Sequence, residues 1–195
     1  MNLPNKLTLV RMFLVPAVVA FILYDFAPHR WLIAGLLFGA AAITDAIDGH
    51  IARSRGLVTD FGKLMDPVAD KMLVIATLVA FIAKGLCSPW IAIIVLLREF
   101  LVTSIRMVSS AKGIVIPANW WGKAKTITQM VAIVIVFVVQ YAFYLCDVLN
   151  IAVSAPIKEG IAVAGDVALW ISAAATIISG VVYAKQSGDI FKDVK

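Results

Sequence analysis

With 195 residues, of which 62% are hydrophobic and only 15% are charged, the chain is too apolar for a disordered polymer or an ordinary water-soluble domain. Its formal net charge of +5 suggests contact with anionic lipid head groups. Nucleic acid is not an expected partner, because the sequence has no basic and aromatic array of the kind that grips single strands. We expect one membrane domain over residues 1–195, since a second domain has no room.

Hydrophobic runs of about 18 to 25 residues recur along the chain, and a helix of that length crosses about 30 Å of hydrocarbon. Barrel strands are shorter and alternate, so strands are not expected. The first run could be a cleaved signal peptide, but Arg11 interrupts it and no small-residue cleavage site follows, so a retained helix is expected. The predicted class is an all-α integral membrane protein with six transmembrane helices, at residues 7–25, 31–52, 64–83, 89–109, 121–146 and 160–184.

The basic residues predict the orientation of these helices. Of the 17 Lys and Arg residues, only Arg30, Lys84 and Lys158 fall on one side of the predicted membrane, and the other side is therefore cytoplasmic. Both termini then lie in the cytoplasm, and residues 185–195 are expected to be a solvated end.

For the cysteines and tryptophans near the predicted helix ends, the sequence predicts only general structural roles. Cys87 and Cys146 lack the spacing of a metal site, so they are expected to be free thiols. Four tryptophans near predicted helix starts are expected to be interface anchors: Trp31, Trp90, Trp120 and Trp121.

Residues 45–70 carry five aspartates, which is unusual in so apolar a chain. Asp45 and Asp48 are three residues apart, and Asp66 and Asp70 are four apart, so each pair shares a helix face. The polar turn between the two predicted helices reverses the chain, and the pairs can meet. The fifth, Asp60, is read as a solvated turn residue.

Four converging carboxylates repel one another unless protons or cations neutralise them. Oxygen ligands without His or Cys favour Mg²⁺, Mn²⁺ or Ca²⁺ over zinc, and two such ions can clamp a phosphoryl displacement. Gly49 and Ala52 then let a bulky ligand lie against the helix, and Arg53 offers a fork to phosphate oxygens. The alternative is an ion-pair cluster with nearby Arg and Lys, but Asp45 lies about 12 Å of helix before Arg53 and so below the interface.

The spacing of this segment, D-x-x-D-G-x-x-A-R, eight residues, then G-x-x-x-D-x-x-x-D, resembles the signature of the CDP-alcohol phosphatidyltransferases at all its fixed positions. The resemblance implies a six-helix architecture, a homodimer and transfer of a phosphatidyl group from CDP-diacylglycerol to an alcohol, with CMP as leaving group. Two divalent cations are implied, with Mg²⁺ expected and Mn²⁺ as the alternative.

The same resemblance implies roles for single residues. Asp70 would be the general base, and the metal ligands would be Asp45, Asp48, Asp66 and Asp70. The CDP group would be bordered by Asp48, Gly49, Ala52, Arg53, Thr59 and Gly62. Asn5, Thr8 and Arg11 recur at helical spacing at the start of the first helix, where they face either the nucleotide or the membrane interface.

The acceptor alcohol is suggested by other segments. "NLPNKLTLVRMFLVP" and "REFLVTSIRMV…WWGKAKTITQM" resemble the corresponding regions of bacterial phosphatidylglycerophosphate synthases, which implies sn-glycerol 3-phosphate and the cytoplasmic membrane of a bacterium, with the active site facing the cytoplasm. An anionic acceptor also suits the basic residues, because Arg98 and Arg106 share a helix face and lie near the level of Lys123 and Lys125. Alternatively, Arg98 pairs with Glu99 or an aspartate, and the lysines bind lipid head groups.

Three alternative functions were weighed against the sequence. The same chemistry could use inositol phosphate, serine or phosphatidylglycerol as acceptor. A small cation transporter would place its acids near the membrane midplane, in discontinuous helices. An intramembrane prenyltransferase also binds Mg²⁺-pyrophosphate through aspartates, but it usually has more helices and a different acidic spacing.

Overall fold

The computed structural model describes the backbone of residues 3–55, 60–111, 113 and 120–192, and the side chains of residues 8–44, 68–69, 71–111, 113 and 120–188. These residues form six α-helices joined by short connections, and no strand occurs among them. The helices are α1 (Leu3–Leu23), α2 (Arg30–Arg55), α3 (Asp60–Ala83), α4 (Pro89–Ala111), α5 (Trp120–Val148) and α6 (Ala155–Lys192).

Each predicted helix overlaps one observed helix, so the all-α class is confirmed. Two helices in the described part of the chain are long and apolar enough to cross a membrane, over Trp120–Val148 and Ala155–Gly188. The first three helices contain shorter apolar stretches. The charged residues Arg98, Glu99 and Arg106 interrupt the apolar character of α4.

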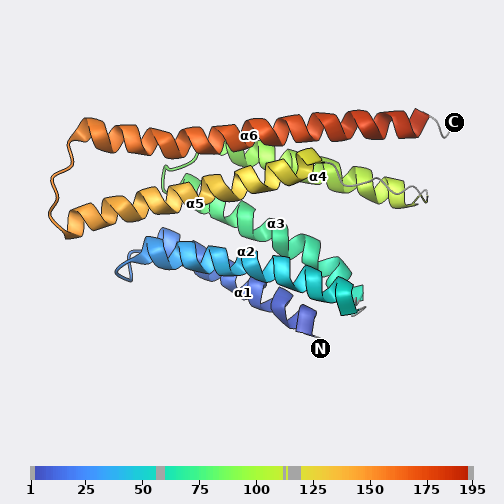
Figure 1. Cartoon of the computed structure of the whole chain (residues 1–195), viewed down its shortest axis with the longest axis horizontal. Helices are drawn as coiled ribbons and strands as arrows, with labels where there is room; N and C mark the ends of the chain where they lie inside the picture. The colour runs from blue at the N-terminus through green and yellow to red at the C-terminus, as the bar shows by residue number, and fades with distance from the viewer. Residues whose placement is uncertain (1–2, 56–59, 112, 114–119, 193–195) are drawn as a thin grey trace.

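The six helices form two groups of three that lie against each other (Figure 1). In the first group, α1 packs against both α2 and α3, and in the second, α6 packs against both α4 and α5. Contacts of α2 with α5 and of α3 with α4 join the groups. The two chain ends lie at the same end of the molecule, because three up-and-down helix pairs return the chain to where it began (Figure 1).

Aromatic packing fills the junction between the two groups. The Phe137 ring of α5 lies 5.8 Å from the Phe38 ring of α2 and 5.2 Å from the Phe81 ring of α3, measured between ring centroids. All three side chains are buried. A Cβ at Gly35 would lie 3.4 Å from the Phe137 Cβ, so the small residue permits close approach of α2 and α5. Close packing of this kind fixes the helices that carry the site.

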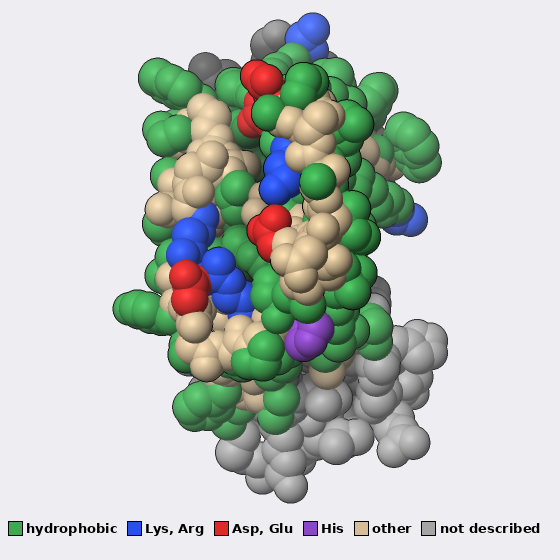
Figure 2. Space-filling model, turned by 90° about the vertical axis from the view of Figure 1, so that its left-hand side faces the viewer, with side chains coloured by type: hydrophobic (Ala, Val, Ile, Leu, Met, Phe, Trp, Pro, Cys, Tyr) green, Lys and Arg blue, Asp and Glu red, His purple; other side chains and the backbone are tan. Residues whose placement is uncertain are grey.

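Charged residues at the end opposite the termini occur in pairs of opposite sign, and Figure 2 shows acidic and basic side chains together on this face. Asp25 pairs with Arg30 and lies 3.9 Å from the Lys84 ammonium. Lys158 pairs with Asp147 at 3.2 Å. Each of the three basic residues that the sequence assigned to this side therefore has an acidic neighbour.

Helices α3 and α5 end at this face with left-handed residues. Gly85 has φ 71°, and the Leu86 N–H donates to the Phe81 carbonyl at 2.8 Å. Asn150 has φ 54°, and the Ile151 N–H donates to the Cys146 carbonyl at 2.9 Å. These bonds satisfy carbonyls that each last helical turn leaves open.

The structure corrects two expectations. Trp31 is 6% exposed and packs 6.5 Å from the Phe137 ring, so its prediction as an interface anchor is wrong, whereas Trp90 and Trp120 are exposed. The last helix also ends later than expected, because α6 continues to Lys192 instead of residue 184; of the side chains described in the expected solvated end, Ser187 alone is buried, donating to the Tyr183 carbonyl at 2.8 Å.

Both cysteines are free thiols, as expected. Cys87 lies in the connection between α3 and α4, and burial, with a smaller contribution from the Asp166 carboxylate, raises the pKa of its thiol to about 11. Cys87 is therefore protonated at neutral pH, and a thiol in that state is a weak nucleophile.

Candidate active site

The acidic segment occupies the last turns of α2 and the first turns of α3. Asp45 and Asp48 lie within one continuous helix, and Asp66 and Asp70 lie within the next. The helical backbone therefore gives each pair a shared face, as the spacing predicted. The side chains of these four residues lie outside the described part of the structure.

The backbone spacing and the donor chemistry of this segment fit divalent cations. Both pairs stand on regular helix at the spacing that aligns carboxylates, and carboxylate oxygens are the ligands that Mg²⁺ and Mn²⁺ prefer. Among the side chains that the structure describes, no group of three or more His, Cys, Asp or Glu could hold a metal ion.

For most of the residues expected to border CDP, the structure describes the backbone but not the side chain. Thr59 lies outside the described residues. Gly49, Ala52 and Arg53 lie on α2, Gly62 lies on α3 and Asn5 lies on α1, all beyond the described side chains.

Thr8 and Arg11 are described, and they are 1% and 0% exposed. Both lie on α1, which packs against the two acidic helices. The interface alternative for these two residues is therefore wrong, while their contact with a nucleotide stays a prediction.

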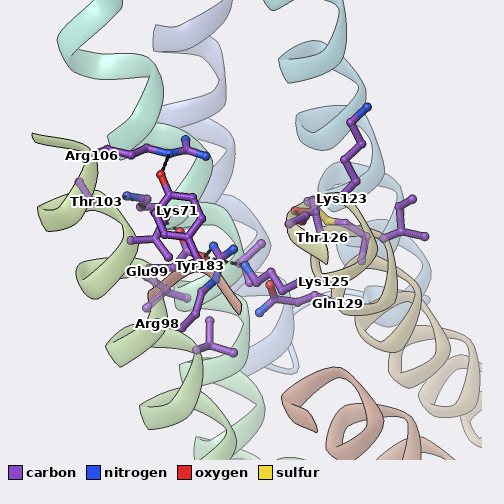
Figure 3. Close-up of a pocket in the computed structure, with 17 residues that line it drawn as sticks. Lys71, Arg98, Glu99, Thr103, Arg106, Lys123, Lys125, Thr126, Gln129 and Tyr183 are labelled. Carbon is purple, nitrogen blue, oxygen red and sulfur yellow. Dashed lines mark hydrogen bonds and ion pairs between the residues drawn. The ribbon is translucent and has the colours of Figure 1, made fainter. Parts of the chain in front are cut away.

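A basic pocket of about 710 Å³ opens between α3, α4, α5 and α6 (Figure 3). The acceptor residues predicted from sequence all line it, although they come from two helices. Its charged lining residues are Lys71, Arg98, Glu99, Arg106, Lys123 and Lys125.

The inner part of the pocket is organised around the Glu99 carboxylate. Its Oε1 accepts from the Lys125 ammonium at 2.7 Å and from the Arg98 Nη1 at 3.0 Å. Its Oε2 lies 3.9 Å from the Lys71 ammonium, which also donates to the Thr103 hydroxyl. Three cations on three different helices therefore meet one carboxylate.

The outer part of the pocket has a different character. Arg106 donates from Nε to the Tyr183 hydroxyl at 3.1 Å, and its guanidinium carbon lies 5.5 Å from the centroid of that ring. Tyr183 is 3% exposed, so it holds this face of the guanidinium in place. Lys123 lies across from Arg106, on the opposite side of the opening (Figure 3).

Small residues make room for the long Arg98 side chain. Its Nη2 donates to the Ser179 hydroxyl at 2.8 Å. A Cβ at Gly180 would lie 3.3 Å from the Arg98 Cγ, and one at Gly122 would lie 3.8 Å from its Nη2. The guanidinium therefore reaches Glu99 along a path that α6 leaves open.

The sequence also allowed Arg98 to pair with Glu99 instead of binding the acceptor. The structure shows this ion pair, and Arg98 lines the pocket as well. No acceptor role was predicted for Lys71, Glu99, Thr103 or Tyr183. Glu99 and Thr103 lie within the segment that resembles the synthases, but only the packing of α3, α4 and α6 brings all four residues to one pocket.

The family described as "CDP-alcohol phosphatidyltransferase" matches residues 1–179 of this chain. The chain belongs to this family. The match spans both the acidic segment and most of the basic pocket, and it ends shortly before Tyr183.

Several relatives match large parts of this chain. It is 36% identical to the "CDP-diacylglycerol--glycerol-3-phosphate 3-phosphatidyltransferase" of Bacillus subtilis, over 98% of this chain and 97% of the relative. The protein of that name from Rickettsia bellii is 36% identical over 94% of both chains. A "Probable phosphatidylglycerophosphate synthase" of Mycobacterium tuberculosis is 40% identical over 68% of this chain and 64% of its own.

Proposed function

We propose that this protein is an integral membrane enzyme that transfers the phosphatidyl group of CDP-diacylglycerol to sn-glycerol 3-phosphate, giving phosphatidylglycerophosphate and CMP. The observation that carries the proposal is the match, over nearly the full length of both chains, to relatives named for this reaction. The basic pocket supports it, because a phosphorylated acceptor needs cations that the metal-bound pyrophosphate does not occupy. Family membership favours this reaction over cation transport and prenyl transfer.

In the reaction, a hydroxyl oxygen of glycerol 3-phosphate forms a bond to the lipid-side phosphorus, and the bond from that phosphorus to the CMP oxygen breaks. Asp70 accepts the hydroxyl proton, and CMP leaves with the electron pair of the broken bond. Asp45, Asp48, Asp66 and Asp70 would hold the divalent cations, Mg²⁺ first and Mn²⁺ as the alternative. When bound, the two cations supply charge neutralisation to the pyrophosphate and to the departing CMP.

The chain residues around this centre bind and orient the substrates. Gly49, Ala52, Arg53, Thr59 and Gly62 would border the CDP group.

At the start of α1, Asn5, Thr8 and Arg11 would lie beside the nucleotide. Arg106 and Lys123 would bind the acceptor phosphate, with Arg98 and Lys125 behind them. Residues of α4 and α5 would thereby hold the acceptor in reach of α3, and such positioning lowers the entropic part of the barrier.

We further propose six transmembrane helices in a single domain over residues 1–195, with both termini and the active site on the cytoplasmic side of a bacterial inner membrane. The common position of the termini supports an even number of crossings (Figure 1). Acidic neighbours offset the basic residues at the opposite end, in keeping with the positive-inside rule. A homodimer is a prediction from the family.

The test is CMP release by the purified protein in detergent, with CDP-diacylglycerol and Mg²⁺. Glycerol 3-phosphate, inositol phosphate, serine, phosphatidylglycerol and no acceptor are compared side by side. Release only with glycerol 3-phosphate, together with a phosphatidylglycerophosphate product, is the expected result. Release with another alcohol would keep the aspartate chemistry and overturn the acceptor, and no release with any acceptor would overturn the reaction.

A further inference from the structure

A buried carboxylate is unexpected in a pocket that binds a phosphorylated acceptor. The Glu99 side chain is 15% exposed, and a carboxylate repels a phosphate group in a site with little water. Glu99 nevertheless lines the pocket beside five cations. Its position relative to those cations indicates what it does.

The five cations divide into two sets. Lys125 and Arg98 donate directly to Glu99, at 2.7 and 3.0 Å, and Lys71 lies 3.9 Å from it. Arg106 and Lys123 form the outer set, and Arg106 is held by the neutral Tyr183 hydroxyl instead. Figure 3 shows Arg106 and Lys123 on the far side of Glu99 from Arg98, with Lys71 beside Thr103 between Glu99 and Arg106. Arg106 lies seven residues after Glu99, or about 10 Å along α4.

The two ends therefore offer different environments to a phosphate. At the inner end, a phosphate would meet the Glu99 charge and would have to displace the carboxylate from Lys125 and Arg98. At the outer end, the described lining residues include no acid. The outer end is thus the favourable place for phosphate, because the inner donors are engaged.

The carboxylate also has bonding capacity left. Its Oε2 has Lys71 at 3.9 Å, which is beyond hydrogen-bond distance, so this oxygen can accept from a hydroxyl group. Gln129 offers a complementary group, because it is 3% exposed and its amide nitrogen has no partner among the described residues. Hydroxyl groups therefore suit the inner end, where a phosphate does not.

We propose that Glu99 is a positioning and specificity residue that fixes the direction in which a polyol monophosphate enters this pocket. It keeps the phosphate at Arg106 and Lys123 and leaves the inner end to the hydroxyl groups. This inference rests on the proposed function for its substrate class. The new element is the role of the acid: the Glu99 carboxylate makes the inner end unfavourable for phosphate and so prevents the acceptor from binding in the reversed direction.

The first test replaces Glu99 by Gln, which keeps the size and the ability to bond a hydroxyl but removes the charge. The freed inner cations then form a second phosphate site, and glycerol 3-phosphate binds in both directions. Because the reversed complex cannot react, kcat and KM for the acceptor should both fall by about fivefold while kcat/KM stays within about twofold. The inhibition constant of inorganic phosphate against the acceptor should fall by about tenfold.

Two controls separate charge from other effects. Glu99→Asp keeps the charge and should keep the discrimination against inorganic phosphate. Asp147→Asn makes the same acid-to-amide change at the Lys158 ion pair at the far end of the molecule, and it should leave all constants unchanged.

A second measurement does not depend on the folding of Glu99→Gln. Lys123→Met and Lys125→Met remove the same side chain two residues apart on α5. If the phosphate binds at the outer end, Lys123→Met raises the acceptor KM by about tenfold and Lys125→Met by less than about threefold. The reverse order would overturn the proposed direction.

The Glu99 proposal is also overturned if Glu99→Gln lowers kcat/KM without a gain in phosphate affinity, or if it changes nothing. The proposed function has its own readout in the same experiment, since it fails if the unaltered protein releases no CMP with glycerol 3-phosphate. In that case, calorimetric titration with inorganic phosphate still compares Glu99→Gln with the unaltered protein. Tighter binding of phosphate by the variant supports the role of Glu99, and equal binding contradicts it.

Discussion

The two halves of this molecule carry opposite chemistry. Helices α2 and α3 bring the aspartates, within a single segment of 26 residues from Asp45 to Asp70. The basic pocket draws on α3, α4, α5 and α6, and its lining extends from Lys71 to Tyr183. The proposed reaction would need both parts, because the acids would hold cations for the pyrophosphate while the basic residues would bind the acceptor.

This difference predicts how each half responds to mutation. In the acidic half, the proposed ligands act as one unit, so the loss of one member removes most of the function. In the basic half, several cations share one anion, so the loss of one member weakens binding by a limited factor. The following variants test that contrast.

Asp70→Asn should have the largest effect. The amide cannot accept the proton of the attacking hydroxyl and is a poorer ligand for a cation, so kcat should fall by at least about 10³-fold. CMP release measures the loss, and an unchanged thermal unfolding transition in detergent shows that the fold survives. An Asp70→Asn protein with near-normal turnover would contradict the assignment of Asp70 as general base.

Arg106→Ala should have the next largest effect. A charged hydrogen bond to the acceptor phosphate is lost, which corresponds to about a 10- to 100-fold rise in the KM for glycerol 3-phosphate. The KM for CDP-diacylglycerol should change by less than about threefold, because the proposed liponucleotide site lies in the other half. Equal rises in both KM values would contradict the separation of the two subsites.

The same contrast explains what the sequence could predict. Asp45, Asp48, Asp66 and Asp70 are recognisable because helical spacing alone places each pair on one face. Tyr183 is not recognisable, because its role depends on which helices pack together and a lone Tyr has no spacing to read. Glu99 is recognisable only as a partner for Arg98, because its contacts with Lys125 and Lys71 depend on the same packing.

Helix positions follow a similar rule. The apolar periods predicted the six helices to within a few residues at most ends. The longer course of α6 was missed because residues 185–192 are polar, and their local composition favours a solvated end. The helix nevertheless continues to Lys192, and Ser187 is buried within the folded protein.

Tyr183→Phe tests how far the pocket depends on such a contact. The phenyl ring keeps its stacking with Arg106 and loses only the hydrogen bond to Nε, so the acceptor KM should rise by about threefold with little change in kcat. Tyr141→Phe deletes the same hydroxyl near His29, at the far end of the molecule, and serves as the matched control. A rise in KM with the control variant as well would show that the effect does not come from Arg106.

Gly180→Ala should have the smallest effect, and it tests the room that α6 leaves for Arg98. The added methyl group would lie 3.3 Å from the Arg98 Cγ, so the side chain must shift by a few tenths of an ångström and its bonds to Glu99 and Ser179 lengthen. A rise of about twofold in the acceptor KM is expected, despite the helix stabilisation of about 0.5–1 kcal/mol that Ala brings over Gly. Gly160→Ala gives α6 the same gain where a Cβ meets nothing within 4 Å, so it should raise stability and leave the KM unchanged. If both variants behave alike, the Arg98 path is wide enough for a methyl group, and the small residue at 180 has no part in shaping the pocket.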